Sequence, residues 1–231
     1  MIYYIIAFND ENIFDSYINR YLPKDRSVIV KNEDGNSMFS KYNYGLKMLK
    51  EKLNDDDVVC FVHEDVRILD DHFESKAQMV FDNCPDIGIL GVYGTTEFTE
   101  GGGWWMTDRK LNCRGHIMQD KPELSEPFHM TEGHIGFYDD LVSVDGCCFF
   151  MRGKIAQNYS FDDFTYDGYH FYDVDCCFSV LEMGYKISVA DILIEHASEG
   201  PLPDSWHQNR MKFLEKWSLR GKSFPITKNN F

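Results

Sequence analysis

The sequence predicts an α/β protein built on a doubly wound, open and mostly parallel sheet with helices on both faces. Strand-like apolar runs alternate with helix-like segments four times within about the first 95 residues, which is the pattern of such a sheet. One of these runs, Val58 to Val62, is apolar on every side, as a central parallel strand buried on both faces requires.

The first half is assigned in order from its apolar periodicity. Ile2 to Phe8 is a β-rich run, and Asn9 and Asp10 then cap a helix-like segment that ends near Pro23. The elements that follow are a strand over 27–30, a helix over 38–53, the strand over 58–62, a helix over 70–83 and a strand over 87–93.

The character changes over residues 94–140, which contain three consecutive glycines, the pair Trp104-Trp105 and little periodicity. We expect a long functional loop region here, whose aromatic side chains pack on the rest of the protein. Regular elements then return as a strand over 141–151, a helix over 170–183 that ends at Gly184, one or two strands over 186–195, and a helix over 204–217. Because the sequence shows no linker or repeat, we expect a single domain over 1–231.

The composition excludes several functional classes. Lys and Arg total 23 against 38 Asp and Glu, a formal net charge of −15. A surface this acidic repels nucleic acids and anionic lipid headgroups, so we expect no nucleic-acid partner. Any phosphorylated ligand would need local positive charge from a metal ion, a few basic side chains or helix amino-termini.

The seven cysteines include two adjacent pairs and no C-x-x-C spacing, which argues against a disulfide framework or a zinc ribbon. The apolar opening, Met1 to Phe8, is too short for a signal peptide or a membrane span and has no basic flank. We therefore expect a cytoplasmic protein without an integral membrane segment.

Three polar groups stand where they can carry chemistry. His63-Glu64-Asp65 follows the most buried strand, where carboxylates can hold a divalent cation, although charged residues also simply end strands at solvent. Asp173 and Asp175 open a helix, where one can act as a general base or both can merely favour the helix dipole.

His196 is the third candidate, because the apolar strand 192–195 delivers it to the strand's end. A neutral imidazole is a competent ligand for Mn²⁺ beside a carboxylate. The alternative is a hydrogen-bonded structural histidine.

A resemblance covers nearly the whole chain, except 94–140. The ordered segments that carry it are YIIAFND, SKYNYGLKML, CFVHEDVRIL, VDGCCFFMRG, HFYDVDCCFSVLEMGYKISVA, IEHASEG and NRMKFLEKW. Together they resemble a GT-A glycosyltransferase of the family 2 type, and more narrowly its StrF-like branch. The resemblance implies one GT-A domain, with a nucleotide-binding half over 1–95 and an acceptor-binding half over 96–231.

The resemblance also implies roles for individual residues. The implied nucleotide-side and sugar-side contacts are Ala7, Asn9, Asn43, Asp145, Gly146 and Arg210. Asp65 would be the main carboxylate ligand of Mn²⁺ or Mg²⁺, His196 would complete the metal site, and Asp173 would be the catalytic base. The closing helix with Asn209 and Trp217 would cover the diphosphate, unless these residues only pack. The family usually has Asp-x-Asp where this chain has His-Glu-Asp, which leaves the roles of His63 and Glu64 open.

The activity implied is transfer of a sugar from a nucleotide-sugar donor, by default a UDP-sugar, to a saccharide or other hydroxyl acceptor with inversion. Two alternatives stay open. Carboxylates and histidines at strand ends also serve metal-dependent nucleotidyltransferases and phosphohydrolases. Trp104 and Trp105 would equally suit a non-catalytic carbohydrate-binding module.

Overall fold

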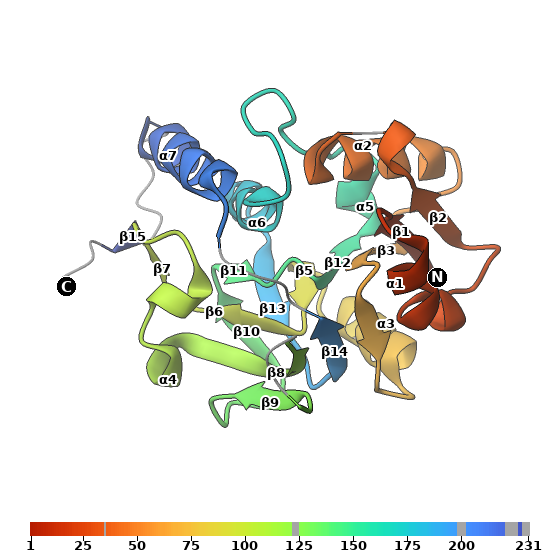
Figure 1. Ribbon diagram of the computed structural model, residues 1–231, viewed down its shortest axis with the longest axis horizontal. Coiled ribbons are helices and arrows are strands. Elements are labelled where there is room, and N and C mark those ends of the chain that lie inside the picture. Colours follow the sequence, from red (N-terminus) through yellow and green to blue (C-terminus); the bar gives the residue numbers. More distant parts are fainter. Residues whose placement is uncertain (35, 122–124, 198–201, 220–225, 228–231) are drawn as a thin grey trace.

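The computed structural model describes residues 1–34, 36–121, 125–197, 202–219 and 226–227. Its centre is a seven-stranded sheet with the order β10-β13-β5-β12-β3-β1-β2 (Figure 1). The bounds are β1 Ile2–Ala7, β2 Ser27–Val30, β3 Val58–His63, β5 Ile87–Gly91, β10 Tyr138–Leu141, β12 Cys148–Arg152 and β13 Lys186–Val189.

Five strands of this sheet share one direction, and β10 and β12 run against them. The prediction of an open, mostly parallel sheet is therefore confirmed. Because β12 is antiparallel and lies between β3 and β5, its beginning at Cys148 pairs with Val62, at the edge where the parallel strands end. The loop before β12 thus meets the carboxyl ends of the parallel strands, where open α/β sheets bind ligands.

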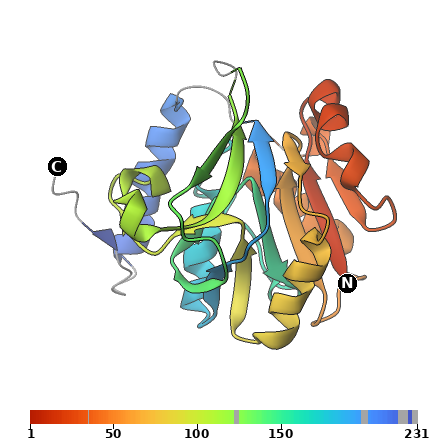
Figure 2. The same cartoon turned by 90° about the horizontal axis from the view of Figure 1, so that it is seen from below.

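Helices and short helical turns cover both faces of the sheet, as predicted (Figures 1 and 2). Their bounds are α1 Glu11–Ser16, α2 Met38–Leu49, α3 Phe73–Asn83, α4 Arg109–Asn112, α5 Gly153–Ala156, α6 Tyr172–Glu182 and α7 Asp204–Leu219. The side chain of Asp10 accepts hydrogen bonds from the backbone of Asn12 and Ile13, so the predicted cap of α1 is confirmed. Gly184 follows α6 with a φ of 90°, a conformation that favours glycine.

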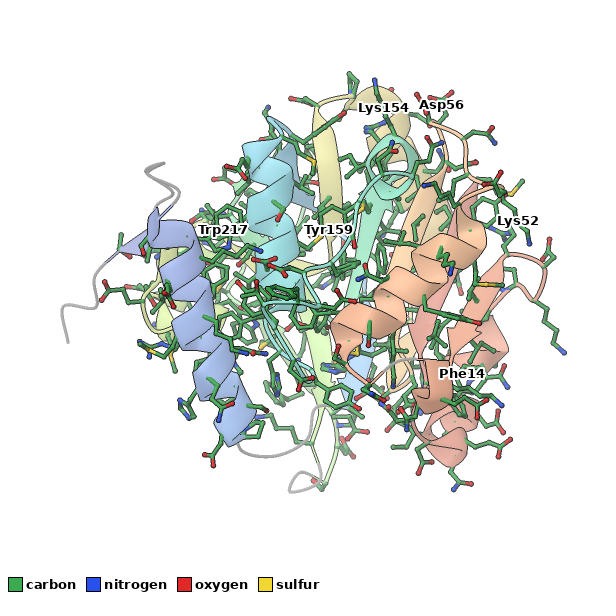
Figure 3. All side chains as sticks on the ribbon, turned by 90° about the horizontal axis from the view of Figure 1, so that it is seen from above. Phe14, Lys52, Asp56, Lys154, Tyr159 and Trp217 are labelled. Atoms are coloured by element: carbon green, nitrogen blue, oxygen red, sulfur yellow. The ribbon has the colours of Figure 1, made fainter. Side chains whose placement is uncertain are left out.

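Alternate residues of each central strand enter two separate hydrophobic cores. Ile5 and Phe61 face the core formed with α2, α6 and α7, whereas Ile6 and Val62 face the core formed with α1 and α3. Figure 3 shows α2, α6 and α7 side by side over one face, with Trp217 of α7 at the α6 side. A strand such as β3 needs apolar residues at every position because both of its faces are buried, which is why its sequence was informative.

The prediction of a loop region over 94–140 is wrong. The described part of this segment contributes strands to a second sheet of order β11-β6-β8-β14-β4, with β9 paired to β8. The strands are β4 Val66–Ile68, β6 Tyr93–Thr95, β8 Cys113–Asp120, β9 Phe128–Thr131, β11 Ser143–Val144 and β14 Ile194–Ala197; a small pair is β7 Phe98–Thr99 with β15 Ile226–Thr227. No helix among the described residues is both long enough and apolar enough to cross a membrane.

Candidate functional site

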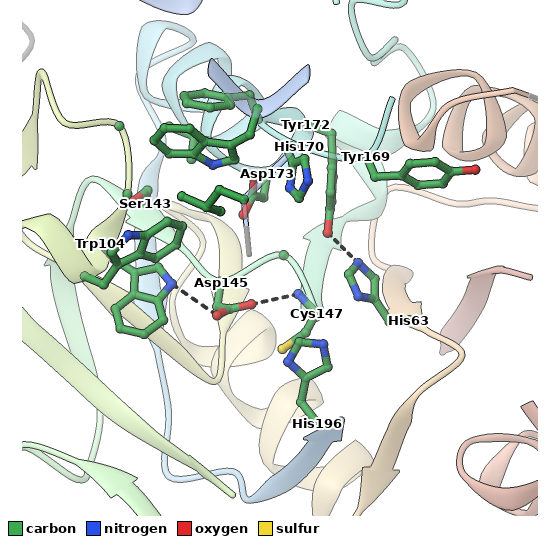
Figure 4. A pocket seen from close by; sticks show the side chains of 18 of the residues that line it. His63, Trp104, Ser143, Asp145, Cys147, Tyr169, His170, Tyr172, Asp173 and His196 are labelled. Atoms are coloured by element: carbon green, nitrogen blue, oxygen red, sulfur yellow. Dashed lines mark hydrogen bonds between the residues drawn. The ribbon is translucent and has the colours of Figure 1, made fainter. Parts of the chain in front are cut away.

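A cavity of about 790 Å³ opens at the edge where the central parallel strands end. We call it the central cavity. Its walls come from the β3–β4 turn, the loop 102–105, β8 and β9, the loop 145–147, the start of α6, and β14 (Figure 4). A volume of this size lies within the roughly 300–1,000 Å³ that ligand pockets occupy.

Asp65, His63 and His196 meet in the central cavity. One nitrogen of each imidazole and one carboxylate oxygen lie within 4.8 Å of one another. The distance from His196 Nε2 to Asp65 Oδ2 is 3.5 Å, and that from His63 Nδ1 to Asp65 Oδ1 is 3.8 Å. The backbone fixes this meeting, because β14 pairs antiparallel with β4, and the amide of Ala197 donates to the carbonyl of Asp65 at 3.1 Å.

These three side chains suit a divalent transition-metal ion such as Mn²⁺. Burial, together with the nearby His196 and His170, lowers the pKa of His63 to about 3, so its imidazole is neutral at physiological pH. The Nδ1 atom of His196 is buried and has no hydrogen-bond partner among the described residues. Two imidazoles beside one carboxylate are a donor set that binds such ions well.

Asp173 faces the same cavity from the first turn of α6. Burial first and the charge of Asp145 second raise its pKa to about 7, although backbone amides, including that of Gly146, oppose the rise. A Cβ on Gly146 would lie 2.2 Å from the Tyr172 hydroxyl and 2.9 Å from the Asp173 Cβ. Only glycine therefore lets this loop approach the start of α6 so closely, and the backbone amide of Gly146 hydrogen-bonds the Asp173 carboxylate there.

Asp145 is held from two sides. Its Oδ1 accepts from the backbone amide of Cys147 at 3.0 Å, and its Oδ2 accepts from Nε1 of Trp104 at 3.1 Å (Figure 4). Asp145, Cys147 and His196 also place one donor atom each within 4.8 Å of one another. Asp145 thus lies between the tryptophan loop, His196 and Asp173.

Glu64 and His63 have distinct roles that the sequence left open. Oε2 of Glu64 accepts from the backbone amides of Asn9 at 2.6 Å and Asp10 at 3.0 Å, so Glu64 holds the loop after β1. Nε2 of His63 lies 2.6 Å from the hydroxyl of Tyr172, which orients the imidazole toward Asp65.

Asn9 belongs to a second group of polar residues, which we call the β1–β2 cluster: Asn9, Asn32, Lys41 and Glu64. Nζ of Lys41 is fully buried and donates to the carbonyl of Phe8 at 3.2 Å and to the side-chain oxygens of Asn9 and Asn32. Burial lowers the pKa of Lys41, and the charge of Glu64 opposes this. The cluster therefore fixes the loops after β1 and β2.

The remaining residues implied on the nucleotide side lie outside the central cavity. Ala7 is 3% exposed and packs in the core. Asn43 uses both ends of its amide on the 160–163 loop, for example from Nδ2 to the Phe161 carbonyl at 2.8 Å. Arg210 donates from Nε to the carbonyl of Glu100 at 2.6 Å, behind Gly102 of the cavity wall.

The closing helix α7 fastens the loop that precedes α6. Nδ2 of Asn209 donates to the carbonyls of Asp167 at 2.6 Å and His170 at 3.0 Å. Next to them, Phe171 has a φ of 73°, a strained conformation for a residue other than glycine, of the kind found at functional sites. Trp217 is 1% exposed and packs in the hydrophobic core.

Asp175 completes the fastening of α7. It is 2% exposed and accepts from Lys216 Nζ at 2.8 Å, from Trp217 Nε1 at 2.9 Å and from the Tyr166 hydroxyl at 3.0 Å. The two acids at the start of α6 therefore serve different purposes, with Asp173 toward the cavity and Asp175 toward α7.

Of the residues singled out from the sequence, the structure brings Asp65, His196, Asp145, Gly146 and Asp173 together in one cavity. Sequence reasoning missed Gln119 and Trp206 as parts of its wall, and it gave no role to Tyr172. His63 is the last residue of β3 and Asp65 lies in the turn that follows, so the alternation of the strand did not by itself predict that both side chains reach the cavity. Ser198, Glu199 and Gly200 of the matched IEHASEG segment lie outside the described residues.

Two solved structures share this fold at low sequence identity. A crystal structure of A197 from STIV is 11% identical, with a TM-score of 0.50, and the match covers 86% of each chain. GalNAc-T7, solved with UDP, GalNAc and Mn²⁺, is 8% identical, with a TM-score of 0.55; the match covers 89% of this chain and 45% of that one. This likeness supports the GT-A fold. No curated protein matches the sequence.

The family model described as "Glycosyltransferase like family" matches residues 3–223, which is nearly the whole chain. The match includes the strand that presents Asp65, the start of α6 with Asp173, and the strand that delivers His196. On this evidence, and with a GT-A fold around the central cavity, the chain belongs to the glycosyltransferase-like family.

Proposed function

We propose that this protein transfers a sugar from a nucleotide-sugar donor, by default a UDP-sugar, to a hydroxyl group of a saccharide or other acceptor, with inversion. The observation that carries the proposal is the convergence of His63, Asp65 and His196 on one point of a cavity that Asp173 also faces. A cation-binding group beside a carboxylate with a pKa of about 7 provides the two activities that such a transfer needs.

Asp65 and His196 are the proposed ligands of Mn²⁺ or Mg²⁺, with His63 as a third. A bound ion would supply positive charge to the leaving diphosphate, beside the cations Arg109 and Lys121 that also line the cavity of this acidic protein. Tyr172 holds His63 in place through the hydroxyl–Nε2 contact of 2.6 Å.

Asp173 is the proposed base. Its carboxylate accepts the proton of the acceptor hydroxyl as that oxygen forms a bond to the anomeric carbon. The bond from the anomeric carbon to the diphosphate oxygen breaks at the same time, and the nucleoside diphosphate leaves with the electron pair. The backbone amide of Gly146 hydrogen-bonds this carboxylate, and the nearby charge of Asp145 raises its pKa. One displacement of this kind inverts the anomeric carbon.

The other parts of the proposal follow from the family resemblance. We propose that residues 1–95 hold the nucleotide and that residues 96–231 hold the acceptor. Ala7, Asn9, Asn43 and Arg210 are proposed to support the donor, in each case from outside the central cavity. Membership of the StrF-like branch and a cytoplasmic location remain predictions.

The test replaces Asp173 by Asn. We expect UDP binding in the presence of Mn²⁺ to stay unchanged and transfer to fall by at least about a hundredfold, because general base catalysis contributes that much. Asp25→Asn, at an exposed carboxylate outside the cavity, is the matched control and should keep full activity. An active Asp173→Asn enzyme would eliminate the assigned base.

Product analysis separates this function from the two rivals. A transferase releases a nucleoside diphosphate and a glycosylated acceptor, whereas a nucleotidyltransferase releases pyrophosphate. A carbohydrate-binding module would bind sugar regardless of UDP and Mn²⁺. Calorimetry with UDP, with and without Mn²⁺, distinguishes the module directly, because metal-dependent nucleotide binding supports the transferase.

A further inference from the structure

We propose that the acceptor is itself a saccharide and that one of its rings stacks on the exposed indole of Trp105 in the central cavity. This inference rests on the proposed transfer function, because it assigns the acceptor side of the same site. It concerns the loop 101–105, a motif of the sequence that neither the metal ligands nor the base explain.

The glycines before the tryptophan pair give the indole its position. A Cβ on Gly103 would lie 2.5 Å from the Trp105 ring, and Gly102 has a φ of 93°. Any larger residue at 103 would push the indole away from the backbone, and an L-residue at 102 would strain the turn. The glycine run therefore lets the Trp105 ring fold back over its own loop.

Neighbouring aromatic rings brace Trp105 without covering it. The centroid of its ring lies 5.3 Å from that of Trp104, nearly perpendicular to it, and 6.0 Å from that of Trp206 of α7. Trp206 is only 3% exposed, whereas Trp105 is 39% exposed. A rigid, partly exposed indole that lines a cavity offers a large contact area at a small entropic cost, which suits the apolar C–H face of a sugar ring.

The polar lining of the cavity favours a ligand with many hydroxyl groups. Oε1 of Gln119 is buried without a hydrogen-bond partner among the described residues, and Gln119 pairs in register with His196. Asp145 and Asp173 add carboxylate acceptors. A hydrocarbon chain would leave these acceptors unsatisfied, whereas sugar hydroxyls would donate to them.

Trp104 lies on the side of the cavity away from His63, and we place the acceptor on that side. In Figure 4, Trp104 and His63 are on opposite sides of Asp145 and Asp173. The leaving diphosphate would lie with the metal ligands, and in an inverting displacement the attacking hydroxyl comes from the opposite face of the donor sugar. Trp104 is joined to the base through Asp145 and Gly146, so a ring on Trp105 would be held close to Asp173.

The experiment measures binding of the methyl glycosides of glucose, galactose and N-acetylglucosamine by saturation-transfer NMR and titration, with UDP and Mn²⁺ present. Farnesyl phosphate and a short Ser/Thr peptide serve as probes of the other acceptor classes. We expect at least one glycoside to bind through its ring C–H protons, and Trp105→Ala to weaken it at least about tenfold, which corresponds to about 1.4 kcal/mol. Trp105→Phe should retain most of the binding.

Phe164→Ala is the matched control, because Phe164 is 99% exposed and does not line the cavity. Equal glycoside binding by wild type and Trp105→Ala, or no binding of any glycoside, would overturn the inference. So would Trp105-dependent binding of the farnesyl phosphate or the peptide alone. Binding of UDP with Mn²⁺, measured separately, should be the same in all variants, and its absence from the wild type would count against the proposed function instead.

Discussion

The β1–β2 cluster and the central cavity lie at the same edge of the main sheet, yet they use their polar side chains in opposite ways. In the cluster, Lys41 donates hydrogen bonds to the loops after β1 and β2, and Glu64 accepts hydrogen bonds from the loop after β1. In the cavity, His196 and Gln119 keep buried atoms without partners among the described residues. Tyr169 borders both regions, since it lines the cavity and its ring centroid lies 5.6 Å from Lys41 Nζ.

This difference separates residues that shape a site from residues that act in it. Buried polar atoms are nearly always paired in native proteins, so atoms left unpaired in a cavity point to a ligand that completes them. A residue such as Lys41, whose hydrogen bonds are all made within the chain, instead holds the loops that shape the site. The predictions below test this division, starting with the largest expected effect.

Glu64 and Asp65 are adjacent in the sequence, but Glu64 belongs to the residues that shape the site and Asp65 to those proposed to act in it. Asp65→Ala should weaken Mn²⁺-dependent UDP binding by at least about a hundredfold, because it removes the proposed carboxylate ligand of the ion, and leave unfolding of the metal-free protein little changed. Glu64→Ala should lower the free energy of unfolding by about 1–3 kcal/mol, because two backbone amides lose their acceptor. Calorimetry and urea unfolding measure the two quantities. If the two variants gave the same pattern, the division would fail.

The pH dependence of transfer tests the state of Asp173. Only the ionised carboxylate accepts a proton, so kcat/KM should fall about tenfold for each pH unit below a pKa of about 7. Because the charge of Asp145 raises this pKa, Asp145→Asn should move the acid limb to lower pH. If the acid limb of the pH profile did not move, the charge of Asp145 would not influence the pKa of Asp173.

The same carboxyl affects stability with a defined sign. Its folded pKa of about 7 lies above its ordinary value of 3.8, so the folded state loses stability as pH rises between these values. Asp173→Asn should therefore raise the Tm more at pH 8 than at pH 4.5.

Lys41→Met tests the cluster itself. The substitution keeps an unbranched side chain but leaves the acceptors on Phe8, Asn9 and Asn32 without their shared donor. We expect a loss of about 1–3 kcal/mol in the free energy of unfolding, together with weaker UDP binding, by urea unfolding and calorimetry. If the substitution instead weakened Mn²⁺ binding in the absence of nucleotide, the cluster would contribute to the metal site, and the division would be wrong.

Trp104→Phe should have the smallest effect. It retains a ring but removes the Nε1 donor to Asp145, a bond with a net value of about 0.5–1.5 kcal/mol. We expect kcat to fall by a few-fold with nucleotide binding unchanged, and steady-state kinetics measure both. An unchanged kcat would show that Asp145 does not need this contact.

Much of the fold was predictable because several strands and helix ends have clear sequence patterns. Val58 to Val62 is apolar at every position since both faces of β3 are covered, and Asp10 caps α1 as its residue type suggests. Strand β8 gave no such signal. It changes partners near Gly115, from β6 to β9 and β14, and buries the polar His116 and Gln119, so neither an alternation nor an apolar run appears.

The candidate site was predictable to a similar degree. Asp65 follows β3, His196 lies near the end of β14 and Asp173 stands in the first turn of α6, and the structure brings all three into one cavity. Asn43 could not be placed in the same way. A sequence shows that an amide is present but not whether the amide is already used, and here both ends of Asn43 hold the 160–163 loop.

The attachment of α7 has a practical consequence for producing this protein. A version shortened to end before Asp204 would remove Lys216 and Trp217, two donors to the Asp175 carboxylate, and would uncover the apolar residues that pack against Phe213 and Trp217 in the core. It would also release the segment 167–170 that Asn209 secures. Shortened forms of the protein made for crystallisation should therefore retain α7. Without this helix we expect the protein to be insoluble or inactive.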